Sequence, residues 1–114
     1  MGYWRHVSEA EHEVSPGRWR TFYRRLIGLD DGIENVEVIV AEMKVGGSSL
    51  LHFHDECEQV MYILEGTMQV EIEGERAELS AGHAVWVPRG AIHEVNNAGS
   101  EPLRFLLIYA PPRR

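Results

Sequence analysis

The sequence lacks two features that mark exported and membrane proteins. Cys57 is the only cysteine, so no intrachain disulfide can form and nothing implies an oxidising compartment. Residues 1–13 are polar and charged, without the apolar stretch that a signal peptide or a transmembrane helix needs. We therefore expect a soluble, cytoplasmic protein with no membrane partner.

Basic residues are also few. The chain has 11 lysines and arginines against 18 aspartates and glutamates, which leaves a formal net charge of −7 at pH 7. Phosphate binding needs a basic excess, so this balance argues against nucleic acid as a partner. Several arginines nonetheless cluster near the N-terminus: Arg18, Arg20, Arg24 and Arg25. We interpret them as a solvated strand face that pairs with acidic neighbours; the alternative is a surface that binds an anionic substrate.

The length of 114 residues predicts one compact domain over residues 1–114, because it is enough to bury one core and short for two. Short runs of apolar residues, most of them ended by glycine, indicate strands. In residues 67–73 the apolar side chains of Met68, Val70 and Ile72 alternate with polar ones, which is the period of a half-buried strand. Similar runs predict strands at residues 19–27, 36–45, 60–64, 84–87, 92–95 and 103–109. This spacing is typical of an all-β, antiparallel sandwich or barrel.

A His-x-His triplet, His52 to His54, lies in an apolar, strand-like run. Side chains alternate along a strand, so His52 and His54 would project from one face, about 6 to 7 Å apart. Two imidazoles in this arrangement can share a metal ion. A third histidine, His93, follows in a segment that is punctuated by glycine and proline.

These residues match the two motifs of the cupin superfamily. The first motif is a glycine, a His-x-His pair, an acidic or amide ligand and a second glycine, here Gly46, His52, His54, Gln59 and Gly66. The second motif is met at every fixed position by Gly82, Pro88, Gly90, His93 and Asn97. The chain thus resembles a small cupin over roughly residues 36–109, preceded by an N-terminal arm at about residues 1–18. The resemblance implies an antiparallel jelly-roll barrel of the RmlC-like type, a double-stranded β-helix.

The resemblance also implies one divalent transition metal ion per chain, held by His52, His54, His93 and a fourth donor. The spacing to Gly66 places that donor on Gln59, where the family usually has glutamate. Glu58 is the competing donor, because a bulge in the strand would turn it inward. A neutral glutamine leaves the full +2 charge on the ion, which makes it a stronger Lewis acid. Mixed nitrogen and oxygen ligands suit manganese, iron, nickel, cobalt and zinc alike.

Alternation also predicts an apolar pocket around the ion. Its wall would be formed by Met61, Ile63, Trp86, Val95, Phe105 and Leu107. Tyr109 is the candidate catalytic residue, because it or an arginine is the polar group that remains. The last strand carries no carboxylate, unlike small cupins that open unsaturated uronates, and this argues against uronate chemistry.

We favour a metalloenzyme similar to the small cupin dioxygenases, an oxidoreductase that acts on an apolar or aromatic chelating substrate. The first alternative resembles the cupin lyases, isomerases and polyketide cyclases, in which a non-redox ion polarises a carbonyl. The second is a cupin that binds or senses a small molecule without turnover. Val60, Tyr62 and Leu64 would form an exposed apolar patch on the outer face, so we also predict a homodimer.

Overall fold

The computed structural model describes residues 2–113, which form antiparallel strands and two short 3₁₀ turns. The turns are η1 (Val7–Glu9) and η2 (Leu29–Asp31). The strands are β1 (His12–Glu13), β2 (Arg18–Ile27), β3 (Glu37–Ser49), β4 (Glu58–Glu65), β5 (Thr67–Ile72), β6 (Glu75–Ser80), β7 (Ala84–Val87), β8 (His93–Asn96) and β9 (Leu103–Ala110). Within the described residues, no helix has the length and apolar character needed to span a bilayer.

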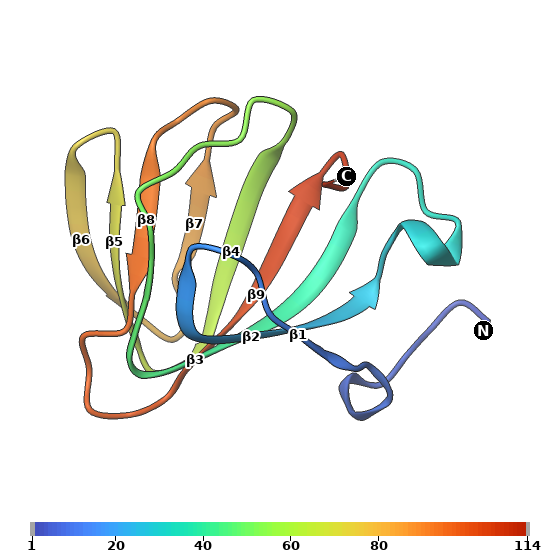
Figure 1. Cartoon of the computed structure of the whole chain (residues 1–114), viewed down its shortest axis with the longest axis horizontal. Helices are drawn as coiled ribbons and strands as arrows, with labels where there is room; N and C mark the ends of the chain where they lie inside the picture. Colours follow the sequence, from blue (N-terminus) through green and yellow to red (C-terminus); the bar gives the residue numbers. More distant parts are fainter. Residues whose placement is uncertain (1, 114) are drawn as a thin grey trace.

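The strands form one continuous sheet that curls on itself. Its order is β6-β5-β8-β3-β9-β4-β7, and β2 pairs with both β1 and β3. All of these pairings are antiparallel, so the all-β, antiparallel prediction is confirmed. Figure 1 shows β6, β5 and β8 on one side of the barrel and β4, β9 and β3 on the other, with the segment between β3 and β4 crossing in front.

The interior of the barrel is layered along the strands. One layer is polar: Glu37 pairs with Tyr109 across β3 and β9, and Tyr109 pairs with Gln59 across β9 and β4. The next layer lies two residues deeper in the barrel on each strand. It is apolar and consists of Ile39, Leu107, Met61 and Val85. The apolar core therefore lies below the polar layer, and two further buried polar residues, Thr21 and Asn97, lie beside Met43 at the other end of β3.

The observed strands follow the predicted ones, with one extension. β7 coincides with the predicted strand at residues 84–87. β3 continues to Ser49, four residues beyond its predicted end, because Gly46 adopts a left-handed conformation with φ of +80°. A glycine at that angle bends the strand without ending it. As a result, Ser49 lies at the polar end of the barrel.

Gly66 makes the sharp turn between β4 and β5. Its φ of +86° favours glycine, and a Cβ atom there would lie 2.5 Å from the backbone oxygen of Pro102. Gly74, in the turn between β5 and β6, has a similar φ of +82° but open space around it. The two positions thus share the same backbone conformation and differ in crowding.

We expect Gly66→Ala to lower the free energy of unfolding by about 1 to 3 kcal/mol more than Gly74→Ala does. Both substitutions strain the left-handed backbone, but only the first also forces a methyl group against the β9 segment. Urea denaturation of the two variants measures the difference. Equal losses of stability would show that the approach of Pro102 to Gly66 does not constrain the turn.

Candidate metal centre

The His-x-His triplet lies in the segment between β3 and β4 and not in a regular strand, so its predicted strand was wrong. A single antiparallel bridge joins this segment to the barrel: the N–H of His52 donates to the carbonyl of His93 (2.9 Å), and the N–H of His93 donates to the carbonyl of His52 (2.7 Å). The N–H of Gly90 donates to the carbonyl of His54 (2.7 Å). This pairing preserves the alternation, so Phe53 points to solvent and the two histidines point inward.

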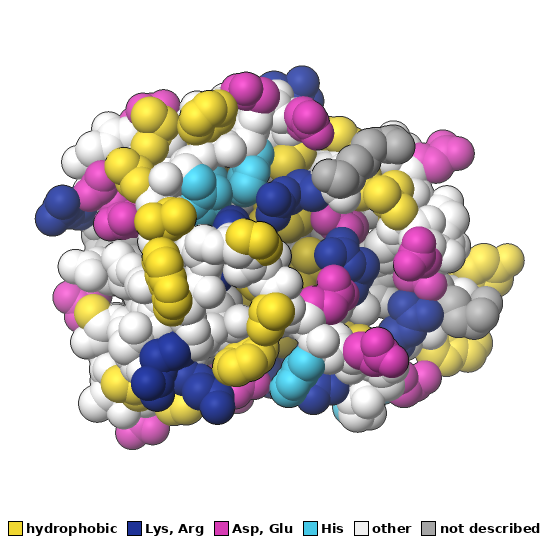
Figure 2. All heavy atoms as spheres, viewed as in Figure 1, with side chains coloured by type: hydrophobic (Ala, Val, Ile, Leu, Met, Phe, Trp, Pro, Cys, Tyr) yellow, Lys and Arg dark blue, Asp and Glu magenta, His cyan; other side chains and the backbone are white. Residues whose placement is uncertain are grey.

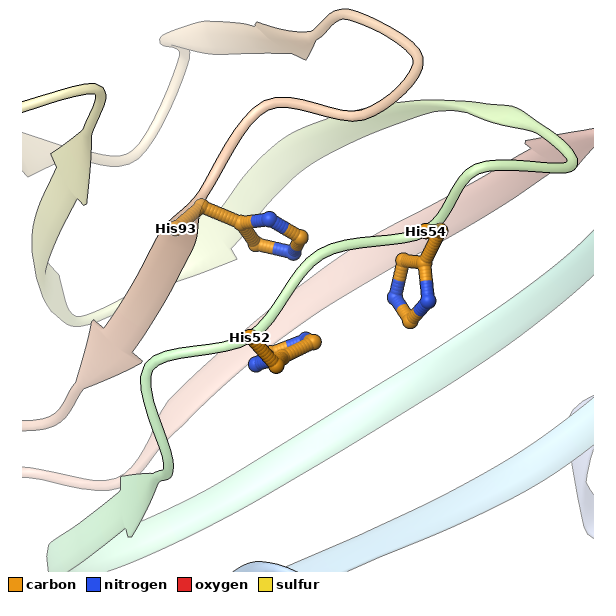
Figure 3. A group of neighbouring side chains, drawn as sticks. All are labelled: His52, His54 and His93. Atoms are coloured by element: carbon orange, nitrogen blue, oxygen red, sulfur yellow. The ribbon is translucent and has the colours of Figure 1, made fainter.

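The three motif histidines come together at the polar end of the barrel. The ring centres of His52 and His93 lie 4.2 Å apart, those of His52 and His54 4.9 Å, and those of His54 and His93 5.4 Å. One ring nitrogen from each lies within 4.8 Å of the other two. Figure 3 shows two of the rings reaching from the β3–β4 segment toward the third, which extends from the start of β8.

Backbone carbonyls fix which nitrogen faces the cluster in two of the three rings, those of His52 and His93. The Nδ1 of His52 contacts the carbonyl of Leu50, and the Nδ1 of His93 contacts the carbonyl of Ala91 at 3.0 Å. A carbonyl only accepts, so Nδ1 carries the proton in both rings and Nε2 carries a lone pair, which in His52 faces Nη2 of Arg18 at 2.9 Å. The Nε2 atoms of His54 and His93 are buried without a hydrogen-bond donor among residues 2–113.

The histidine rings are neutral at physiological pH. Burial lowers the pKa of His52 to about 4 and the pKa of His54 to about 3, and it also lowers the pKa of His93. The guanidinium groups of Arg18 and Arg113 lower all three values further by charge repulsion. Neutral imidazole is the form that binds a metal ion, so the site does not have to lose protons before binding.

Gln59 presents a fourth donor atom to the same cavity. Its side chain is 5% exposed, and its Oε1 is buried without a hydrogen-bond partner in the described part of the chain. Leaving such an oxygen unsatisfied costs about 1 to 3 kcal/mol. Gln59 lines the same cavity as His52 and His93.

Glu58 points away from the cavity. β4 pairs regularly with β7 and β9 at this position, and its one register shift lies later, between Ile63 and Glu65. Regular alternation places Glu58 on the outer face, where it accepts a hydrogen bond from Nε1 of Trp86 at 3.1 Å. The bulge that would have turned Glu58 inward is absent from this part of β4.

Four of the six predicted pocket residues line the cavity: Met61, Val95, Phe105 and Leu107. Ile63 is fully buried in the core two residues further along β4 and does not line the cavity. Trp86 was expected in the wall, but its side chain is 62% exposed on the outer face. Its neighbours in β7, Val85 and Val87, point inward instead, which corrects the predicted orientation of this strand.

The cavity wall also contains polar residues that the predicted pocket lacked. Arg18, Tyr23 and Ser49 line it together with Tyr109. Burial raises the pKa of Tyr109, so its phenol is protonated at neutral pH. Figure 2 shows histidine side chains at the surface beside basic side chains and among hydrophobic ones. Arg18 belongs to the arginine cluster seen in the sequence, whereas no pattern in the sequence indicates Tyr23.

The geometry gives a group of three histidines that could bind a metal ion. The donor atoms fit one divalent ion, because the imidazoles are neutral, backbone carbonyls orient His52 and His93, and the Nε2 atoms of His54 and His93 are buried without partners. Nitrogen donors of this kind suit several transition metals and do not select one.

Comparisons with known proteins show which proteins this chain resembles. The polyketide cyclase RemF from Streptomyces resistomycificus is 30% identical, with a TM-score of 0.86, and the match covers 96% of this chain and 80% of that one. An uncharacterized protein of Methanocaldococcus jannaschii is 35% identical over 72 residues, 63% of this chain and 58% of that protein. The tetracenomycin polyketide synthase protein TcmJ of Streptomyces glaucescens is 31% identical over 70 residues, 61% of this chain and 47% of that protein.

The chain spans about half the length of the curated relatives it matches. A model of the cupin domain matches residues 39–109, which is more than half of the chain and includes all three histidines of the site. The structural similarity extends over nearly the whole chain and confirms the predicted jelly-roll barrel. This protein therefore belongs to the cupin family.

Proposed function

We propose that this protein is a metal-dependent enzyme whose ion is held by His52, His54, His93 and Gln59. The observation that carries the proposal is a set of inward donor atoms without partners: Nε2 of His54, Nε2 of His93 and Oε1 of Gln59. Burying three unsatisfied polar atoms in one place is costly, and a shared cation would offset the cost. The fourth donor is Nε2 of His52, whose orientation the Leu50 carbonyl fixes.

We expect Gln59→Ala to weaken metal affinity about 10-fold to 100-fold, because it removes a donor to the ion. Glu58→Ala should leave affinity unchanged, since this side chain faces outward toward Trp86. Metal content after dialysis, measured by elemental analysis, compares the two variants, with His52→Ala as the reference for a disrupted site. Loss of metal from the Glu58 variant alone would assign the fourth ligand to Glu58.

We propose non-redox chemistry on a carbonyl compound as the reaction class, of the lyase, isomerase or cyclase type. Three neutral imidazoles and a neutral amide would leave the bound ion its full charge, and such an ion acts as a Lewis acid toward a carbonyl oxygen. The polar wall supports this class over the oxygen-dependent one that the sequence favoured, because that preference assumed an apolar wall. The similarity to the polyketide cyclase RemF supports it as well.

Tyr109 is the residue we propose for proton transfer to the substrate. Its ring lies 5.7 Å from the ring of His54, centre to centre, so the phenol borders the histidine cluster. Nη1 of Arg113 donates to the phenol oxygen at 3.3 Å, which leaves the phenolic hydrogen free to point toward the substrate. A buried phenol that stays protonated can donate this hydrogen to an oxygen that gains negative charge.

The second candidate function is that of a dioxygenase, and the apolar residues of the cavity wall support it. Met61, Val95, Phe105 and Leu107 line the inner part of the cavity and would exclude water from a reactive intermediate. The two classes differ in their need for oxygen.

We expect the metal-loaded protein to convert β-dicarbonyl or polyketide-like substrates at the same rate under nitrogen and in air. Parallel measurements with an oxygen electrode and by mass spectrometry of the products test this. Turnover that needs air and consumes oxygen would assign the dioxygenase class. Tight binding without turnover in either atmosphere would assign the protein a binding or sensing role.

We propose a homodimer formed through the outer face of β4, β7 and β9. Val60 pairs with Trp86 on one side and Ile108 on the other, and Tyr62 pairs with Leu106 in the adjacent row. The exposed fractions of Val60, Tyr62 and Trp86 are 37%, 42% and 62%. These side chains form a continuous apolar patch, and such a patch is a common site of association.

Tyr62→Lys should convert the dimer to a monomer, because it places a charge at the centre of the apolar patch. Glu78→Lys, on the exposed strand β6, is the control for the change in charge and should leave the mass unchanged. Light scattering at micromolar concentration measures both. A monomeric mass for the unmodified protein would rule out the dimer.

A further inference from the structure

Arg18 makes an unusual contact at the mouth of the histidine cluster. It is the first residue of β2, and its Nη2 lies 2.9 Å from Nε2 of His52. The Nδ1–H of His52 donates a hydrogen bond to the Leu50 carbonyl, so Nε2 is unprotonated and accepts from the guanidinium. Arg18 therefore donates to the same lone pair that the proposed metal ion would use.

The charge of Arg18 is not balanced by an acidic side chain. Among residues 2–113, the ion pairs to carboxylates are made by Arg5, Arg25, Arg76 and Arg104, and none involves Arg18. Its other hydrogen bond is to the carbonyl of Pro16 at 3.2 Å. A partly buried guanidinium with neutral acceptors alone has unused capacity for an anion, and carboxylates are the partners it binds best.

Arg113 adds a second cation on the other side of the cluster. Its guanidinium lies 5.1 Å from the ring centre of Tyr109 and borders a hollow that is also lined by His54, Asp55 and Glu56. The buried carboxylate of Glu37 does not neutralise it directly, because its oxygens bind the guanidinium of Arg25 and the backbone N–H of Arg113. A guanidinium group thus lies on the His52 side of the histidine cluster and another on the His54 side.

We propose that Arg18 is the residue that binds the substrate, and that it holds an anionic group, a carboxylate or an enolate, next to the metal ion. This inference rests on the metal site of the proposed function. When Nε2 of His52 coordinates an ion, Arg18 loses its acceptor and is left beside a second positive charge. An anion that contacts both would remove this repulsion and satisfy the guanidinium. The substrate class is therefore a carbonyl compound that is anionic when bound.

Arg18 should then couple metal binding to anion binding. Without an anion it opposes the metal ion, since it occupies the lone pair of His52 and repels a cation. With an anion present, it favours the loaded site. Such coupling is reciprocal, so the metal ion must raise the affinity for the anion by the same factor by which the anion raises the affinity for the metal ion.

The test compares Co²⁺ binding and benzoate binding in the wild type, Arg18→Gln and Arg20→Gln. Co²⁺ is titrated alone and followed by its visible absorption, and benzoate is then titrated into the Co²⁺-loaded proteins by calorimetry. We expect Arg18→Gln to bind Co²⁺ no more weakly than the wild type and benzoate about tenfold more weakly. Arg20→Gln removes the same charge from an exposed position of the same strand and should match the wild type in both.

A loss of benzoate affinity without a loss of Co²⁺ affinity distinguishes substrate binding from a structural role. Parallel losses of Co²⁺ and benzoate affinity in Arg18→Gln would show that Arg18 only supports the site, and equal benzoate affinity would show that it does not bind the anion. Either result overturns this inference, and so does a Co²⁺-loaded wild type that binds no benzoate. None of these results contradicts the proposed metal site. A wild type that binds no Co²⁺ overturns the proposed function itself.

Discussion

The site depends on one backbone interaction, the antiparallel bridge between His52 and His93. Its two hydrogen bonds hold the β3–β4 segment against β8, although this segment is outside any regular strand. Because the two residues are paired directly, their side chains leave the same face, and the rings reach 4.2 Å between centres. The alternation imposed by the bridge then brings His54 to that face and sends Phe53 to solvent. One bridge thus imposes strand geometry on a segment that is outside any regular strand.

The barrel tolerates this polar cluster because the polar and apolar parts of its interior are separated in layers. Glu37, Tyr109 and Gln59 form one layer of paired positions, and the next layer, with Ile39, Leu107 and Met61, is apolar. The free energy of burial comes from the apolar layers, about 25 cal/mol for each Å² of apolar surface. The polar layer costs free energy where its atoms lack partners, as Oε1 of Gln59 does. In this cupin barrel the stability of the apolar core offsets the cost of the unsatisfied donor atoms and holds them in a fixed geometry.

The charged side chains around the site bear on which ligands it can bind, as the donor atoms do. The inward donor set is neutral, and the guanidinium groups of Arg18 and Arg113 lower the pKa of its histidines by charge repulsion. An ion bound there would keep its charge and add to that of the two arginines, which favours substrates that become anionic. The buried phenol of Tyr109 borders the same space, so an electrophile, anion-binding groups and a proton donor would face one substrate.

Much of this arrangement could be predicted from local patterns. The period of two in β5, the His-x-His triplet and the spacing of His93 after Gly82 are properties of short segments, and all three led to the observed fold and histidine cluster. The direction of Gln59 followed from alternation along β4. Trp86 was misplaced because the inward parity of a four-residue strand depends on its pairing with β4, which its own sequence does not encode.

The sequence by itself therefore determined the strands, the cupin family and the residues able to bind a metal ion, because these depend on side-chain period and motif spacing. Only the tertiary structure decided what surrounds them. Arg18 and His52 are 34 positions apart in the sequence. They come into contact because β2 pairs with β3. The outward partner of Glu58 and the cation beside Tyr109 have the same origin. Contacts of this kind are set by the pairing of distant strands, and no local pattern specifies them.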